Sequence, residues 1–219
     1  SLEWRRNFVR TYLERDIPQL GISIPAAALR RFWTMLAHWH GQVWNGAELA
    51  RSMSLDGKTV RRYLDLLTGT FMLRQLQPWY TNLGKRQVRA PKIYLRDTGI
   101  LHHLLSLNDF DALPSHPRVG ASWEGFVLEQ VITLLRLSDP YFWSTYQGAE
   151  LDLFFQLSGR SFGIEVKYAE APKVTRSMRI ALEDLRLDHL WVIHPGEYSA
   201  RVDDKITLWP ARDLAGLRE

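Results

Sequence analysis

The chain of 219 residues contains no cysteine. Disulfide bridges and zinc sites built on thiolates are therefore excluded, and we expect a reducing, cytoplasmic setting. No apolar run approaches the roughly 20 residues that a membrane-spanning helix needs. The first residues, SLEWRRNFVRTYLERD, are charged and amphipathic, unlike a secretory signal. We therefore expect no membrane partner.

A strong charge of one sign is also missing. The 28 basic and 24 acidic residues leave a net charge of +4. This mild excess permits a nucleic-acid partner but does not require one. Hydrophobic residues make up 46% of the chain, enough for the core of one large domain or two small ones.

The first half of the sequence has the pattern of a winged-helix-like domain. Asn45, followed three residues later by Glu48, is a capping-box pattern. It begins the first of two short helices that are joined by the polar turn SLDG, a helix-turn-helix arrangement. Two predicted strands follow, with a basic loop between them. The elements expected here are helices at 1–24, 25–41, 46–53, 57–68 and 98–107 and strands at 71–80 and 90–97.

The second half has the pattern of an α/β domain. The stretch NDFDALPSHPRVG, with two prolines and little periodicity, is the best boundary between the halves. Beyond it, we expect a central mixed sheet with helices. Its elements are helices at 120–137 and 174–186 and strands at about 140–146, 149–157, 161–168, 188–195 and 205–209. The predicted domains are a helical linker at 1–24, a winged-helix-like domain at 25–108 and a second domain at 116–219. The fold class is therefore α/β, or α+β for the whole chain.

Acidic residues and a lysine of the second half form the strongest candidate site. Asp152 lies in one predicted strand. Glu165 and Lys167 lie two residues apart in the next strand, so the side chains of these two residues point to the same face. Metal-dependent hydrolysis of a phosphodiester needs this set, because carboxylates bind Mg²⁺ (or Mn²⁺) and the metal activates water. The lysine would orient the water or stabilise the developing charge.

Two further carboxylates belong to this hypothesis, and simpler interpretations stand beside it. Glu124, on the preceding helix, is the candidate third ligand, and Glu150 shares a strand face with Asp152. Glu129 is the competing helical carboxylate, on a different face of that helix. The alternatives are a structural ion pair at a sheet edge and, for Glu124, a glutamate that complements the helix dipole.

Basic residues of the first half are candidates for contact with DNA phosphates. One group lies on the polar face of the second short helix, and the other is a run in the loop of the predicted wing. The alternatives are an ordinary charged helix face, diluted by Asp65, and a mobile loop or a docking surface for another domain. The DNA-binding candidates are Lys58, Arg61, Arg62, Lys85, Arg86 and Arg89, and Lys92 is assigned to the same basic run of the wing.

A GKT triplet at 57–59 has the residues that end a P-loop. A P-loop also needs a glycine where Ser52 stands and a preceding strand, whereas this triplet opens a helix. We therefore expect no ATP site in this chain.

Several segments together carry a resemblance to a known superfamily. They are YLERDI, ELARSMSLDGKTVRRYLDLL, LQPWYTNLGKRQVRAPKIYLRDTGI, VGASWEGFVLEQ, GAELDLFF and GIEVKY. The order of Glu124, Asp152 and Glu165-Val166-Lys167 resembles the PD-(D/E)XK, or restriction-endonuclease-like, fold. The chain is most similar to the C-terminal domain that follows the AAA+ ATPase core of many prokaryotic proteins.

This resemblance implies a fused upstream ATPase domain, and the sequence begins with Ser rather than Met. We therefore expect a fragment of a longer protein, a DNA-interacting module whose nuclease-like domain carries out Mg²⁺-dependent hydrolysis of DNA. The alternative is an inactive nuclease-like domain that serves recognition of DNA or of a protein. A third reading is a module for assembly, including assembly of copies of this chain.

Overall fold

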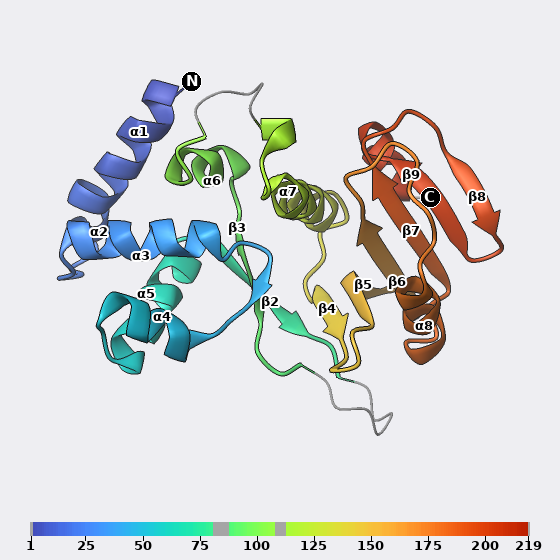
Figure 1. Cartoon of the computed structure of the whole chain (residues 1–219), viewed down its shortest axis with the longest axis horizontal. Helices are drawn as coiled ribbons and strands as arrows, with labels where there is room; N and C mark the ends of the chain where they lie inside the picture. Colours follow the sequence, from blue (N-terminus) through green and yellow to red (C-terminus); the bar gives the residue numbers. More distant parts are fainter. Residues whose placement is uncertain (1, 81–87, 108–112, 219) are drawn as a thin grey trace. The chain divides into compact units, whose positions relative to one another are not determined.

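The computed structural model describes residues 2–80, 88–107 and 113–218 (Figure 1). The chain forms two compact units with a mixed α/β architecture. The first unit comprises Ser1–Gln75 and Ile93–Ser122, and the second comprises Leu76–Lys92 and Trp123–Glu219. The chain therefore passes between the units three times, and each unit is described by itself.

The first unit is mainly helical. The helix predicted at 1–24 is divided, because a π-helical turn at Tyr12–Asp16 separates two α-helical segments. Helical structure also ends earlier than predicted, at Gln19. Its core is built around fully buried Phe32, Trp33 and Leu64. The helices are α1 (Leu2–Thr11), α2 (Ile17–Gln19), α3 (Ala26–His38), α4 (Gly46–Met53), α5 (Gly57–Gly69) and α6 (Thr98–Leu104). Strand β1 (Gln42–Val43) lies within this unit, whereas β2 (Leu73–Pro78) and β3 (Lys92–Leu95) each cross its boundary.

Side-chain caps explain where the short helices of this unit begin. The Asn45 side chain accepts a hydrogen bond from the Glu48 backbone N–H at the start of α4. Asp56 caps α5 and Asp97 caps α6 in the same way. Each cap satisfies a backbone donor that the helix leaves unpaired at its first turn. The helices predicted at 46–53, 57–68 and 98–107 are confirmed, to within three residues at their ends.

The second unit is built on a mixed sheet. Strands β5 and β6 pair antiparallel, whereas β6 with β7 and β7 with β9 pair parallel. The order is β4-β5-β6-β7-β9-β8. The strands are β4 (Tyr141–Ser144), β5 (Glu150–Leu157), β6 (Arg160–Val166), β7 (His189–His194), β8 (Ala200–Asp203) and β9 (Ile206–Pro210).

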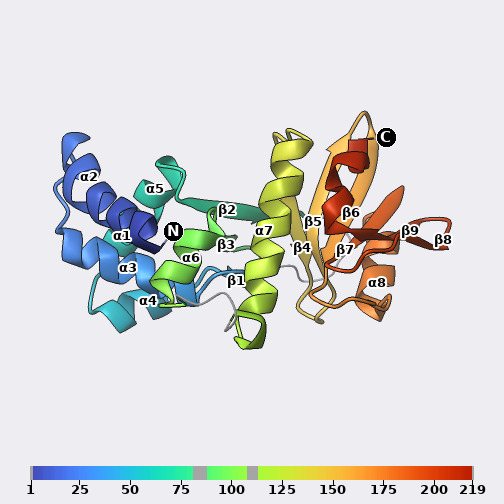
Figure 2. The same cartoon turned by 90° about the horizontal axis from the view of Figure 1, so that it is seen from above.

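Two helices accompany this sheet. Helix α8 (Arg176–Asp184) connects β6 to the parallel strand β7 and packs Met178 and Ala181 against the sheet. Helix α7 (Val119–Leu134) precedes β4, and Figure 2 shows it running along the β4 side of the sheet. At Gly163 of β6, a Cβ atom would lie 2.8 Å from Leu187 Cδ1 and 3.0 Å from Leu190 Cδ1. A larger residue would therefore disturb the packing two residues from Glu165.

The observed units differ from the predicted domains at the segment 76–92. This segment belongs to the second unit, because Gln77 and Pro78 of β2 pair parallel with Tyr141 and Phe142 of β4. The sequence pattern assigned the whole of 71–97 to the first domain, since pairing between distant strands leaves no local signal. Strand β8, which pairs antiparallel with β9, is likewise absent from the predicted elements.

Candidate functional site

Asp152 and Glu165 are brought together by the pairing of β5 with β6. Leu153 pairs with Ile164, and continuing this antiparallel register places Asp152 beside Glu165. The contact is fixed by a hydrogen bond of 2.8 Å from the Val166 backbone N–H to Asp152 Oδ2. Both carboxylates are 5% exposed, so they lie inside the unit rather than on a solvated sheet edge.

Lys167 follows directly on β6 and faces Glu165. Its backbone N–H donates to the Ile193 carbonyl oxygen of β7, which holds the residue in place. Its ammonium lies 2.6 Å from Glu165 Oε1. Burial lowers the pKa of Lys167, but the carboxylates of Glu165, Asp152 and Glu124, Glu165 foremost, together outweigh burial and raise the pKa above its ordinary value. The side chain is 37% exposed, so the ammonium also reaches solvent.

Lys92 lies in the middle of this site, which the sequence did not predict. It is 4% exposed, and its Nζ is 2.7 Å from Glu150 Oε1. The same ammonium is 3.6 Å from Glu124 Oε1 and 3.9 Å from Asp152 Oδ1. The assignment of Lys92 to an exposed basic run of a wing is therefore wrong. All four residues of β3 are buried, and a buried ammonium needs carboxylate partners.

Glu124 and Glu150 reach the site from two other elements. Glu124 projects from α7, and Glu150 opens β5, where its backbone is bonded to Ser177 of α8 in both directions. The structure thus brings together the four predicted residues Glu124, Asp152, Glu165 and Lys167. The competing helical carboxylate, Glu129, is also buried.

The site carries an excess of negative charge. Four carboxylates and two ammonium groups leave a net charge of −2 when all six are ionised. Burial, together with the nearby Glu165 and Glu124 carboxylates, raises the pKa of Asp152 well above its ordinary value. Burial also raises the pKa of Glu165, although Lys167 opposes this. Neither lysine removes the repulsion among the acids.

These residues fit a divalent cation by charge and by donor type. Glu165 Oε2 is buried and has no hydrogen-bond partner among the described residues, which is costly for a carboxylate oxygen. Hard carboxylate oxygens are the ligands that Mg²⁺ and Mn²⁺ prefer. Over the described ranges, however, no group of three or more acidic or histidine side chains is arranged to hold a metal ion. What Glu124, Glu150 and Asp152 share in the structure is the ammonium of Lys92.

Aromatic rings flank the site on the side of α7. The Trp123 ring lies 5.9 Å, between centroids, from both the Phe126 ring and the Tyr168 ring. Trp123 immediately precedes Glu124, and Tyr168 immediately follows Lys167. Phe126 is 41% and Tyr168 is 44% exposed, so this edge of the site presents apolar surface to solvent.

The candidate DNA-binding residues lie apart from this centre in the sequence and on other elements. Lys58, Arg61 and Arg62 are exposed on α5, and Arg61 is paired with Asp65 at 3.0 Å. Arg89 is exposed, and its carbonyl oxygen accepts a hydrogen bond from the Tyr80 hydroxyl. Lys85 and Arg86 lie outside the described residues, so their predicted role stays a prediction.

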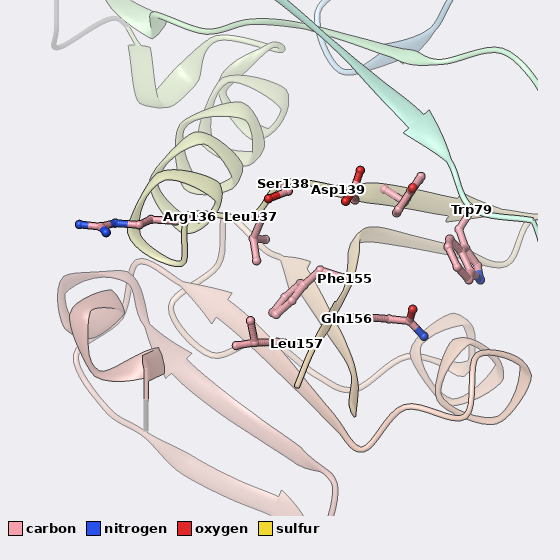
Figure 3. A pocket seen from close by; sticks show the side chains of 9 residues that line it. Trp79, Arg136, Leu137, Ser138, Asp139, Phe155, Gln156 and Leu157 are labelled. Carbon is pink, nitrogen blue, oxygen red and sulfur yellow. The ribbon is translucent and has the colours of Figure 1, made fainter. Parts of the chain in front are cut away.

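A separate pocket of about 360 Å³ lies in the second unit (Figure 3). Figure 3 shows Phe155 beside Leu137 and Leu157, with Arg136 at one end and Trp79 at the other. The lining contains neither Asp152 nor Glu165 nor either lysine of the site. The pocket is therefore distinct from the carboxylate centre.

Comparisons with known proteins extend over nearly the whole chain. Two curated relatives are each 54% identical over 214 residues, and the match covers 98% of this chain but 48% of each relative. They are the uncharacterized protein Mb2031c of Mycobacterium bovis and the uncharacterized protein Rv2008c of Mycobacterium tuberculosis. The chain thus spans about half the length of the curated relatives it matches.

One solved structure resembles part of the chain. The crystal structure of the transcriptional regulator PA3341 matches 62% of this chain and 96% of its own, at 23% identity and a TM-score of 0.26. A score this low carries no argument about fold or function. Among the described residues, no helix has the length and apolar composition needed to cross a membrane.

Two family models match consecutive parts of the chain. Residues 119–214, which hold Glu124, Asp152, Glu165 and Lys167, match a domain of unknown function, DUF4143. Residues 1–111, half of the chain, match a second domain of unknown function, DUF8612. The chain therefore belongs to the family described as domain of unknown function DUF8612.

Proposed function

We propose that the chain is a DNA-interacting module whose second unit hydrolyses DNA phosphodiesters with the help of Mg²⁺ or Mn²⁺. The observation that carries this proposal is the meeting of Asp152, Glu165 and Lys167 in one site. With its four carboxylates and two ammonium groups ionised, this site has a net charge of −2. The unsatisfied Glu165 Oε2 and the nearby Glu124 support it. The site is of the PD-(D/E)XK type, a restriction-endonuclease-like centre.

Each residue has a defined part in this proposal. Asp152 and Glu165 would hold the metal ion, with Glu124 assisting from α7. When bound, the ion supplies a Lewis acid that activates water and offsets charge on the phosphate. The half-exposed Lys167 ammonium is held by Glu165 at 2.6 Å, which positions it to stabilise the charge that develops on the phosphate.

The cleavage assay on Lys167→Met tests this role. We expect the purified wild type to cut DNA in Mg²⁺ or Mn²⁺, and Lys167→Met to cut about 10²–10³-fold more slowly, the usual loss when a stabilising charge is removed. The exposed Lys173→Met in the same unit is the matched control and should retain full activity. A Lys167→Met enzyme as fast as the wild type would contradict the assigned role.

The exposed face of α5 is proposed as the contact with DNA backbone, in a winged-helix-like first domain. We expect Lys58→Ala and Arg62→Ala to weaken binding similarly for all DNA sequences. Each lost phosphate contact should lower the slope of log affinity against log salt by about 0.9. Fluorescence anisotropy at several salt concentrations measures this, with Arg201→Ala as a control on the other unit. Unchanged affinity and slope would remove α5 from the interface.

The ATPase partner is also a proposal. The curated relatives are about twice as long as the matched region, which leaves room in them for the AAA+ domain that the sequence resemblance implies. We propose that this domain acts in cis with the module described here.

A second candidate function is favoured by one observation. The Lys92 ammonium already lies among three of the carboxylates, as an internal cation would in a site that no longer binds metal. In that case the second unit recognises DNA or a protein partner without cleaving it. A wild type that neither cleaves DNA nor binds Mn²⁺ would favour this second function.

A further inference from the structure

Lys92 is a cation inside a site that is proposed to bind another cation. Its ammonium contacts Glu150, Glu124 and Asp152 at 2.7, 3.6 and 3.9 Å. The face of the Phe142 ring, 5.5 Å away, adds a further favourable contact for the charge. These are the carboxylates on which the proposed metal ion depends, and the inference therefore rests on the proposed function.

The Lys92 ammonium stays charged in this setting. Its contacts with Glu150, Glu124 and Asp152 at 2.7, 3.6 and 3.9 Å surround it with carboxylate oxygens, the environment in which a buried amine is held as an ammonium. A divalent ion on Asp152 would thus meet a full positive charge within a few ångströms. In a buried site this repulsion is weakly screened, and it opposes metal binding.

The charge count also sets how many ions the site accepts. With Lys92 and Lys167 in place, the four carboxylates leave a net charge of −2 when all six groups are ionised, and one divalent ion neutralises it. A second divalent ion would need the site to lose both ammonium groups. Because Lys92 is buried and its neighbours along β3 are buried, it cannot swing into solvent as a surface lysine would.

We propose that Lys92 is the resident cation of the site, which competes with divalent metal ions for Glu124, Glu150 and Asp152 and, together with Lys167, limits the site to one such ion. Lys92 thereby lowers the metal affinity without being a ligand. Its proximity to the acids also explains why they can stay together in the absence of metal. Without a counter-ion, the buried Asp152 and Glu165 carboxylates and the partly exposed Glu124 and Glu150 carboxylates repel one another.

Mn²⁺ binding to the full chain tests this inference without an activity measurement. Free Mn²⁺ is counted by electron paramagnetic resonance in wild type, Lys92→Met and Lys92→Arg. We expect one Mn²⁺ per wild-type chain and an affinity at least about tenfold higher in Lys92→Met, which is one atom shorter, unbranched like lysine and uncharged. Lys92→Arg keeps the charge and should stay close to wild type. Equal or weaker binding by Lys92→Met would overturn the proposal.

Three further outcomes are decisive. If Lys92→Met does not fold without metal, recovery of its cooperative melting on addition of Mn²⁺ supports the proposal, because a ligand of the native state stabilises it. Failure of Mn²⁺ to restore folding contradicts it. Binding by Lys92→Met alone, with none in wild type, also supports competition.

The same titrations separate this inference from the proposed function. Asp152→Asn and Glu165→Gln should abolish Mn²⁺ binding if the metal site exists. Absence of binding in every variant overturns both proposals. Normal wild-type binding with no gain in Lys92→Met overturns only the role of Lys92. If Lys92→Met binds Mn²⁺ more tightly but the wild type does not cleave DNA, the role of Lys92 is supported and the proposed hydrolysis is contradicted.

Discussion

Asp152→Asn is expected to abolish metal-dependent cleavage of DNA and to stabilise the metal-free protein. The amide is close in shape to the carboxylate and still accepts the hydrogen bond from the Val166 N–H. It is a poor ligand for Mg²⁺, and the repulsion from Glu165 and Glu124 disappears. We expect at least a hundredfold loss of activity and a gain of about 1 kcal/mol in the free energy of unfolding at neutral pH.

The pH dependence of that gain follows from the pKa of Asp152. Because the pKa is raised in the folded state, the folded protein binds a proton more readily than the unfolded chain does. Stability is therefore lost as the pH rises through the folded pKa, and the advantage of Asp152→Asn should shrink as the pH falls. Chemical denaturation in EDTA at several pH values measures this. The exposed Asp204→Asn is the control, and a variant less stable than wild type at neutral pH would contradict the prediction.

Acid is expected to destabilise the first unit through His40. The ring is 1% exposed, with Nδ1 bonded to the Leu95 N–H at 2.9 Å and Nε2 at 3.1 Å from the Ala121 carbonyl oxygen. Burial lowers the pKa of His40 to about 4. As the pH falls from about 6.5 to about 4, His40 is therefore protonated in the unfolded chain but stays neutral in the folded unit. The free energy of unfolding should fall by an amount that approaches about 3 kcal/mol.

Calorimetric melting between pH 7.5 and 4 measures this loss. His40→Asn, which cannot titrate there, should start less stable but lose less stability on acidification. His38→Asn, at an exposed position of α3, is the control and should follow the wild type. Parallel pH profiles for wild type and His40→Asn would show that His40 is not the group responsible.

The predictions that held depend on local chemistry. Asn45 and Asp97 are caps whose side chains accept hydrogen bonds from the backbone N–H three residues on, so they mark helix starts by local chemistry alone. The alternation along the strand of Glu165 likewise put Glu165 and Lys167 on one face before the register with the strand of Asp152 was known. Glu124 was placed by its position on α7, and it does reach the same centre through Lys92.

The wrong assignment of Lys92 shows where prediction from neighbouring residues fails. In the sequence it ends a run with Lys85, Arg86 and Arg89, and charge alone groups it with them. A signal was nevertheless present, because Lys92 opens the apolar run IYL and the acidic residues of the site outnumber its single predicted cation. A buried lysine in such a strand needs carboxylate partners. The residues next to Lys92 in the sequence do not identify which carboxylates these are.

The sequence by itself determined the helices, most strands, the mixed α/β class and the pairing of two acids with a lysine in the second half. These depend on periodicity and caps, which act within a few residues. Only the tertiary structure decided that Leu76–Lys92 belongs with Trp123–Glu219, and that Lys92 lies among Glu124, Glu150 and Asp152. The physical reason is that strand pairing and buried ion pairs join residues more than 30 positions apart, where each partner is chosen by the fold.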